Sequence, residues 1–200
     1  MASVGSTLTA LGSVPTDGVL AGVRPKRVLL ISNRVMHYRV SVYNYFLRRF
    51  REHGWEFSVL SNELQKQNLN QCQFEFIERP FDFFKYRAEI QRINPDAVIL
   101  FLHLKDWILW PLIHWLKLSG IPVALWTKTR NLDDPDNRVR NAFFDYLHAI
   151  SNGLILYTAS LTRFISDRNR PKVFVANNTI NFEEFPQIGE SKEEIKKDFG

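Results

Sequence analysis

Short apolar runs recur along this 200-residue chain, and helical patterns separate most of them. Seven runs have the length and composition of buried strands: 27–32, 55–61, 72–78, 96–104, 121–127, 153–158 and 172–178. Between them, apolar residues recur with helical spacing, as at Tyr43, Phe46, Leu47 and Phe50, before Gly54. Strands that alternate with helices indicate a parallel sheet covered on both faces. The sequence therefore predicts an α/β, Rossmann-like fold.

The helix after the run at 121–127 carries the most specific signals. Asp134 can cap its start, Pro135 suits its first position, and Gly153 can close it. One continuous apolar stripe follows the helical spacing: Val139, Ala142, Phe143, Tyr146, Leu147 and Ile150. Such a stripe is typical of the core-facing side of an amphipathic helix.

Composition divides the chain into three parts. Residues 1–24 are rich in Gly, Ser, Ala and Thr and lack the basic start and apolar core of a secretory signal, so they are expected to form a flexible tail. Residues 25–186 are expected to form the Rossmann-like domain. Ser191 and Glu194 form a capping box, which predicts that 187–200 is a linker leading into the first helix of a second domain.

Charge and cysteine usage limit the partners. A net charge of +5 favours anionic ligands or an anionic membrane surface, but the basic residues do not gather on one helix, which argues against nucleic acid. The single cysteine, Cys72, excludes an intrachain disulfide and indicates a reducing, cytoplasmic setting. The five histidines are not closely spaced, and the acidic cluster at Asp133, Asp134 and Asp136 resembles a helix start, so no metal site is predicted.

Ligands of such sheets bind outside the carboxyl ends of the strands. The loops expected there are rich in cations and amides, which suit an anionic, oxygen-rich ligand: Arg34, His37, Arg39, His103, Lys105, Lys128, Arg130, Asn131, Asn177 and Asn178. The first of these loops has neither the glycines of a dinucleotide fingerprint nor a phosphate-binding Gly-Lys-Ser/Thr loop. A phosphate or carboxylate would be held there by the side chain of Arg34 or Arg39.

Each candidate also has a plainer interpretation. Arg34 and Arg39 can be solvated or paired with nearby acids, and His103 can be a hydrogen-bonded structural residue instead of a base. Lys128 and Arg130 fit a solvated loop as well as a ligand contact, and Asn177 and Asn178 suit a turn with hydroxyl binding as a second use.

A Trp-rich segment follows the run at 96–104. Trp107, Trp110 and Trp115 fit an ordinary buried crossover helix. Alternatively, some of these rings meet a membrane interface, with Lys105 and Lys117 nearby.

Six stretches, taken in order, resemble the amino-terminal half of family 4 glycosyltransferases of the GT-B fold. They are RVLLISNRVMHYRVSVYNYFLRRF, INPDAVILFLHLKD, GIPVALWTKTRN, SNGLILYTASLTRFI, KVFVANNTINFEEFP and SKEEIKKDFG. The resemblance covers nearly all of 26–200. It rests on the order and spacing of the stretches, since no single motif is sharp.

The resemblance implies a two-domain enzyme that moves a sugar from a nucleotide-sugar donor to a glycan, glycolipid or lipid-linked acceptor. Retention of configuration and independence from metal are expected. This chain would be the acceptor-side half, inactive alone, at the cytoplasmic face of a membrane or free in the cytoplasm. It would bind no cofactor itself, because the second domain holds the nucleotide sugar.

The chain departs from the family pattern at two places. Many members have a glycine pair after the first strand, where this chain has the turn from Arg34 to Arg39. Many also place a histidine near the reacting sugar after the fifth strand, and Lys128 stands roughly at that position, which makes it the catalytic candidate. Arg34, His37, Arg39, His103, Arg130, Asn177 and Asn178 are the substrate-binding candidates. The alternative function is a non-catalytic module that docks on membranes or binds sugar or phosphate.

Overall fold

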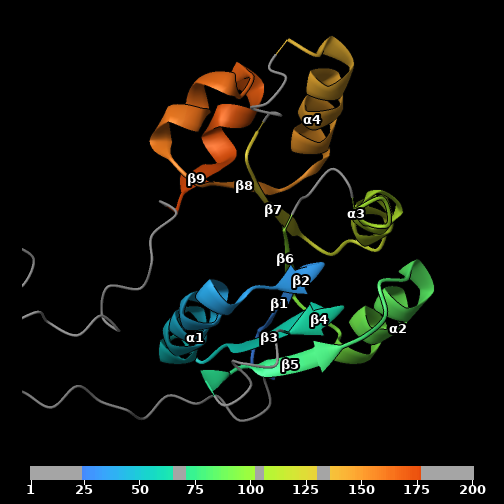
Figure 1. The fold of residues 1–200 in the computed structure, drawn as a ribbon, viewed down its shortest axis with the longest axis vertical. Helices are drawn as coiled ribbons and strands as arrows, with labels where there is room; N and C mark the ends of the chain where they lie inside the picture. Colours follow the sequence, from blue (N-terminus) through green and yellow to red (C-terminus); the bar gives the residue numbers. More distant parts are fainter. Residues whose placement is uncertain (1–23, 65–70, 102–105, 130–135, 177–200) are drawn as a thin grey trace, which may run out of the picture.

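A seven-stranded parallel sheet forms the centre of the molecule (Figure 1). The computed structural model describes residues 24–64, 71–101, 106–129 and 136–176. The strand order is β5-β3-β1-β6-β7-β8-β9. Their bounds are Glu75–Glu78 (β5), Glu56–Ser61 (β3), Arg27–Ile31 (β1), Ala97–Phe101 (β6), Val123–Thr127 (β7), Gly153–Leu156 (β8) and Val173–Val175 (β9). Every predicted run contains one strand, so the predicted α/β, Rossmann-like fold is confirmed.

Helices cover both faces of this sheet. Figure 1 shows α1 (His37–Glu52) on one side and α2 (Phe83–Ile93), α3 (Leu109–Leu118) and α4 (Arg138–Ile150) on the other. Two 3-10 helices, η2 (Ala159–Phe164) and η3 (Asp167–Lys172), connect β8 to β9. A small parallel pair, β2 (Arg34–Val35) and β4 (Glu63–Leu64), extends the ends of β1 and β3.

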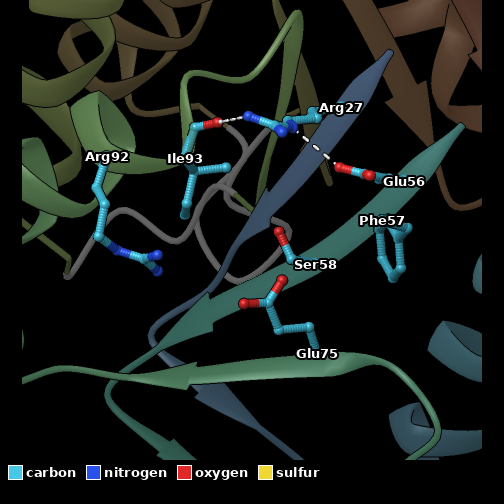
Figure 2. A pocket seen from close by; sticks show the side chains of 7 residues that line it. All are labelled: Arg27, Glu56, Phe57, Ser58, Glu75, Arg92 and Ile93. Carbon is cyan, nitrogen blue, oxygen red and sulfur yellow. Dashed lines mark hydrogen bonds and ion pairs between the residues drawn. The ribbon is translucent and has the colours of Figure 1, made fainter. Parts of the chain in front are cut away.

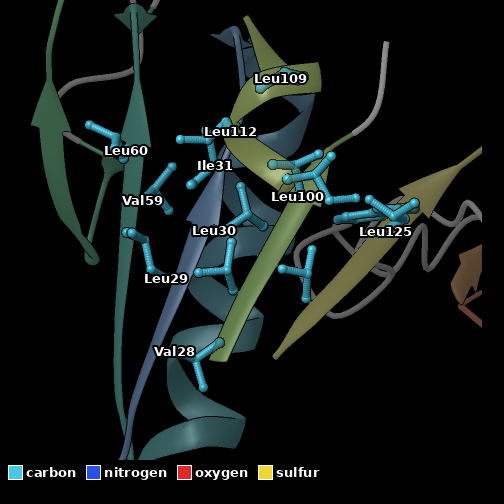
Figure 3. Packing of buried hydrophobic residues seen from close by; sticks show 14 of the residues in the cluster. Val28, Leu29, Leu30, Ile31, Val59, Leu60, Leu100, Leu109, Leu112 and Leu125 are labelled. Carbon is cyan, nitrogen blue, oxygen red and sulfur yellow. The ribbon is translucent and has the colours of Figure 1, made fainter. Parts of the chain in front are cut away.

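The hydrophobic core is centred on β1 and β6. Leu29, Leu30 and Ile31 of β1 are fully buried, because β3 and β6 pair with this strand on its two edges and helices cover its two faces. Figure 3 shows these side chains packed beside Leu60, Leu100 and the residues of α3. Burying one such side chain contributes about 1.5–3 kcal/mol.

The start and the buried face of α4 differ from the sequence prediction. The helix begins at Arg138, and its cap is Asn137, whose side chain accepts a hydrogen bond of 3.0 Å from the backbone N–H of Arg140. Asp134 and Pro135 lie outside the described residues, and the prediction that they begin this helix was wrong, because Asn137 caps it.

The apolar stripe of α4 was also predicted to face the core, and most of it does not. Val139, Phe143 and Tyr146 are 77%, 48% and 47% exposed. The residues that pack inward are Phe144, Leu147 and His148. These three also have the i, i+3, i+4 spacing of one helix face, so the helix carries two apolar stripes and packs the second one on the sheet.

Two lysines form hydrogen bonds with carbonyl groups at the carboxyl-terminal end of α4. Lys172 Nζ donates hydrogen bonds to the carbonyl oxygens of His148 and Ser151, the latter at 2.8 Å. Lys117 Nζ donates to the carbonyl of Ile150 at 2.9 Å. Both ammonium groups therefore satisfy carbonyls that the helix leaves free and complement its dipole.

Candidate functional site

The strand order reverses direction at the boundary between β1 and β6. From β1 the chain goes through α1 to β3 on one edge, whereas from β6 it goes through α3 to β7 on the other. Ligands of open parallel sheets bind at this switch point, outside the carboxyl ends of the strands. Here Asn33 Nδ2 donates a hydrogen bond of 2.9 Å to Asp106 Oδ1, which joins the loops that follow β1 and β6.

Of the two arginines that were predicted to bind a ligand at the first loop, Arg34 is the more exposed, and it forms an ion pair with Glu63. Its guanidinium contacts Glu63 Oε2 from Nη2 at 2.7 Å and from Nε at 2.9 Å. The pairing with a nearby acid is the plainer of the two interpretations from the sequence. His37 is exposed at the first position of α1, with its ring 5.4 Å from that of Tyr38.

Arg39 has a different environment, because its side chain turns from α1 onto the sheet. Arg39 is 9% exposed. The guanidinium carbon lies 4.2 Å from the ring centre of Phe101 and 5.2 Å from that of Trp126. Nη2 donates a long hydrogen bond of 3.3 Å to the hydroxyl of Tyr157. A guanidinium stacks well on aromatic faces and stays charged at any physiological pH.

No carboxylate in the described part of the chain forms an ion pair with Arg39. Aromatic residues of α1, β6 and β7 and the residue after β8 surround it instead, namely Tyr38, Tyr43, Phe101, Trp126 and Tyr157, and we call this set with Arg39 the arginine box. Buried cations are normally paired or bound to a ligand. The arginine box therefore has a positive charge that only hydroxyls and rings offset among the described residues.

Polar atoms of the arginine box are also left without protein partners. The hydroxyl of Tyr43 and Nε1 of Trp126 are buried and make no hydrogen bond within the described structure. Burial raises the pKa of Tyr43 to about 12 against the opposing charge of Arg39, so the hydroxyl keeps its proton. Trp126 Nε1 can only donate, whereas the hydroxyl of Tyr43 can donate or accept, so together with Arg39 they offer several donors to a ligand. Such a group suits an anionic or oxygen-rich ligand.

Lys128 follows directly after β7 and is exposed at the same end of the sheet. Its neighbour Thr129 has a φ of 72°, which is the left-handed region that a β-branched residue rarely adopts. The backbone N–H of Thr129 donates to Thr127 Oγ1 at 3.1 Å, while its own hydroxyl is buried without a hydrogen bond. Strained backbone of this kind concentrates at functional sites, because it sets the direction of a neighbouring side chain.

Four of the predicted site residues lie outside the described residues: His103, Arg130, Asn177 and Asn178. Of the others, Arg39 and Lys128 follow strands β1 and β7, and Arg34 and His37 lie at the edge of the first loop. Their roles in binding and catalysis remain predictions.

Sequence reasoning missed Asn33, Asp106, Tyr43, Trp126, Tyr157 and Thr129. Trp126 and Tyr157 stand at the ends of the predicted strands at 121–127 and 153–158, so their position was visible in the sequence. Their contact with Arg39 was not visible, because it depends on how α1 crosses the sheet.

A cavity of about 310 Å³ lies at the opposite end, near the starts of β1 and β3 (Figure 2). The basic side chains in its wall are bonded to other protein groups. Arg27 contacts Glu56 at 2.9 Å and donates a hydrogen bond to the carbonyl of Ile93 at 3.0 Å. Arg92 belongs to the wall too and contacts Glu89 at 2.7 Å. The cavity is far from the carboxyl ends of the strands, so it does not belong to the candidate site.

Within the described ranges, no three His, Cys, Asp or Glu side chains are grouped as a metal site requires. None of the helices in these ranges is both long and apolar enough to cross a lipid bilayer.

No family model matches the sequence, and no curated protein sequence matches it. Solved structures do match. A glycosyltransferase from Rickettsia africae matches with a TM-score of 0.56 and 12% identity, over 88% of this chain and 49% of that protein. UGT2 of Phytolacca americana, solved with UDP-2fluoro-glucose and pterostilbene, gives a TM-score of 0.54 and 13% identity over 79% and 55%.

A nucleotide-sugar enzyme of another kind has the same fold. The UDP-GlcNAc 2-epimerase from Methanocaldococcus jannaschii matches with a TM-score of 0.55 and 10% identity, over 74% of this chain and 45% of that protein. These are proteins of the GT-B fold. The chain shares their Rossmann-like fold. It spans about half the length of each of these three proteins.

Proposed function

We propose that this chain is the acceptor-side domain of a glycosyltransferase of family 4. The enzyme moves a sugar from a nucleotide-sugar donor to a glycan, glycolipid or lipid-linked acceptor, with retention of configuration and without metal. The donor is held by a second domain that follows the 187–200 segment, and the enzyme works in the cytoplasm or at the cytoplasmic face of a membrane. The chain from residue 1 to residue 200 transfers no sugar alone.

The observation that carries this proposal is the arginine box at the switch point of the sheet. Arg39 is a buried cation with no described carboxylate partner, and Tyr43 and Trp126 offer donors beside it. Phosphates and sugar hydroxyls supply the acceptors that these groups lack. The similarity in fold to glycosyltransferases and to a nucleotide-sugar epimerase supports the same class of substrate.

The predicted site residues then have the following roles in the proposed reaction. Lys128, oriented by the strained backbone at Thr129, supplies a positive charge or a hydrogen bond to the reacting sugar. Arg39 fixes the position of a phosphate or an acidic group of the substrate. His37 and the residues outside the described ranges, His103, Arg130, Asn177 and Asn178, are proposed to contact hydroxyls and phosphates of the substrate.

The test uses a longer chain that carries the proposed second domain. Calorimetry with a panel of nucleotide sugars is expected to show binding by the longer chain and none by residues 1–200. Transfer measured on an acceptor mixture is expected to persist in EDTA and to retain the anomeric configuration, as read by NMR. A longer chain that binds no nucleotide sugar contradicts the proposal.

A further inference from the structure

The loops that follow β1 and β6 place an amide and a carboxylate side by side at the switch point. Asp106 is 6% exposed, and its Oδ1 accepts the hydrogen bond of 2.9 Å from Asn33 Nδ2. Asn33 Oδ1 forms no hydrogen bond with a described residue. A carboxylate oxygen accepts more than one hydrogen bond, and the amide still offers an acceptor and a second N–H. The pair can therefore bind a group that both donates and accepts hydrogen bonds.

Hydrogen bonds of the backbone fix the position of this pair. The carbonyl oxygen of Asn33 accepts from Ser61 Oγ at 3.0 Å and from the backbone N–H of Asn62 at 3.1 Å. The carbonyl oxygen of Asp106 accepts from the backbone N–H of Leu109 at 3.0 Å, where α3 begins. Both residues are thus anchored to regular elements of the fold. Side chains that are held in this way lose little entropy when a ligand binds.

The negative charge of Asp106 acts on the neighbouring Tyr86. The hydroxyl of Tyr86 is buried and donates a long hydrogen bond of 3.4 Å to the carbonyl of Ser32. Burial, and in second place the charge of Asp106, raises the pKa of Tyr86 far above its usual value, so this hydroxyl stays neutral. A carboxylate repels a phosphate group and attracts a neutral hydroxyl that donates to it. Asp106 therefore favours a hydroxyl-bearing ligand.

An exposed indole follows this carboxylate directly in the chain. Trp107 is 70% exposed, and its ring contacts no other aromatic ring and no cation among the described residues. The next two tryptophans have partners: Trp110 meets Phe143 edge-on with ring centres 4.0 Å apart, and Trp115 lies 5.5 Å from the guanidinium of Arg87. The fold thus leaves the surface of Trp107 available to a ligand, next to the polar pair.

A pyranose ring matches this combination of groups. Its hydroxyls both donate and accept hydrogen bonds, as the amide and the carboxylate require. One of its faces carries C–H groups, and these pack on an indole because the aromatic face is negative and the C–H hydrogens are slightly positive. Ligand sites commonly combine aromatic surface with a few polar groups that fix orientation. An isolated phosphate or an acyl chain would use only one of these two features.

We propose that Asn33, Asp106 and Trp107 bind a pyranose ring of the acceptor, with a hydroxyl on Asp106 and the C–H face on Trp107. The inference deepens the proposed function and rests on it only for the role of this sugar as acceptor. It names a sugar hydroxyl, and not a lipid phosphate, as the group that is held at the switch point. The binding itself requires no sugar transfer.

The test is saturation-transfer NMR of the 200-residue protein with four sugars, namely methyl glucoside, methyl mannoside, methyl galactoside and N-acetylglucosamine. We expect at least one of them to bind. Trp107→Ala is expected to raise its Kd at least about fivefold, because the stacking surface is lost. Asp106→Asn still accepts the hydrogen bond from Asn33 and should raise Kd about tenfold, since hydrogen bonds to a charged group are the stronger ones.

Phe84→Ala is the matched control, because Phe84 is an aromatic residue of α2 that is 72% exposed and lies outside this site. It is expected to leave Kd unchanged, and circular dichroism checks that every variant folds. Absence of binding to all four sugars overturns the proposal. A Kd that either site variant leaves unchanged overturns it too.

Two further measurements separate this site from other interpretations. A fluorescence shift with phosphatidylcholine vesicles that depends on Trp107, without a shift with sugars, assigns the ring to a membrane interface and overturns the proposal. In the longer chain, Asp106→Asn should raise KM for a glycan acceptor about tenfold and change kcat less than about threefold. Sugar binding that depends on Trp107 and Asp106, in a protein whose longer chain binds no nucleotide sugar, supports the site and contradicts only the proposed function.

Discussion

Basic side chains at the two ends of the central sheet have different partners. At the amino ends of the strands, basic side chains bond protein oxygens: Arg24 with Asp96, Arg27 with Glu56, and Lys172 and Lys117 with the last carbonyls of α4. At the carboxyl ends, Arg34 pairs with Glu63, but Arg39 is surrounded by rings and one hydroxyl, and Lys128 is exposed. Basic side chains at the amino ends are thus bonded to protein oxygens, whereas Arg39 at the carboxyl ends has no carboxylate partner among the described residues.

Backbone conformation shows the same contrast. Residues with positive φ after helices, at the amino ends of the strands, are Asn94, Gly54 and Gly120, which tolerate that conformation. At the carboxyl ends the residue with positive φ is Thr129, which does not. The backbone next to the proposed catalytic Lys128 is therefore strained. At the opposite end, the described residues with positive φ are glycine or asparagine, which adopt it readily.

The largest effect is expected at Arg39. In the longer chain, Arg39→Met should lower kcat/KM about 100-fold, because hydrogen bonds from a buried cation to a charged ligand contribute up to about 3 kcal/mol. The apolar substitute fits between aromatic rings, so urea denaturation is expected to show a folded protein. Arg27→Met is the control and should change kcat/KM less than about threefold, since Arg27 lies at the opposite end of the sheet and pairs with Glu56. Equal losses in both variants would remove the distinction between the two arginines.

Lys172 should matter for stability and not for ligands. Lys172→Met removes charge-assisted hydrogen bonds to the carbonyls of His148 and Ser151 and is expected to lower the free energy of unfolding by about 2–3 kcal/mol. Lys117→Met removes one exposed bond to Ile150 and should cost less than about 1 kcal/mol. Urea titrations of the two variants measure the difference. A stable Lys172→Met variant would show that the end of α4 does not depend on this cap.

His148 should make stability depend on pH. Its side chain is fully buried, and burial, helped by the charge of Lys172, lowers its pKa from 6.5 to about 4. In the unfolded chain His148 is protonated below about pH 6.5, whereas in the folded protein it stays neutral down to about pH 4. The free energy of unfolding is therefore highest above pH 6.5 and falls as the pH decreases from 6.5 to about 4. The loss from pH 7 to pH 4.5 should be about 2 kcal/mol. His148→Phe should remove that part of the slope, and an unchanged slope would mean that His148 is protonated in the fold.

The smallest effect is expected from the backbone strain. Thr129→Gly should raise the free energy of unfolding by up to about 1 kcal/mol, because glycine adopts positive φ without a steric penalty. In the longer chain it should lower kcat, since Lys128 loses its fixed direction. The opposite exchange, Gly54→Ala, meets no atom within 4 Å and should cost about 1 kcal/mol through its φ of 69° alone, with kcat unchanged. A loss of stability in Thr129→Gly would show that the threonine contributes more than its strain costs.

The fold was predictable because local patterns determine it. The strand runs and Gly54 gave the elements, and parallel strands joined by helices leave few possible arrangements. The α4 stripe was misassigned because a helix with two apolar faces does not reveal which of them meets the sheet. Val139 and Leu147 have the same kind of sequence signal, and only packing separates them.

The candidate site was predictable in position and not in geometry. The rule for strand ends selected Arg34, Arg39 and Lys128, but nothing local distinguishes an arginine paired with Glu63 from one that Phe101 and Trp126 enclose. The contacts of Arg39 with the sheet join residues about 60 to 120 positions apart in the chain, as between Arg39 and Tyr157, with a separation of 118. The left-handed turn at Thr129 is likewise contrary to the preference of its residue type.

The proposed function requires that the carboxyl ends of the strands form one wall of a sugar-transfer site. A crystal structure of the longer chain with a bound nucleotide sugar tests it most directly. The account predicts that the ligand lies against this end, with Lys128 and Arg39 within hydrogen-bonding distance of its sugar, its phosphates or an acceptor. A ligand bound elsewhere, with Arg39 still enclosed by its rings and Lys128 facing only solvent, would contradict the account.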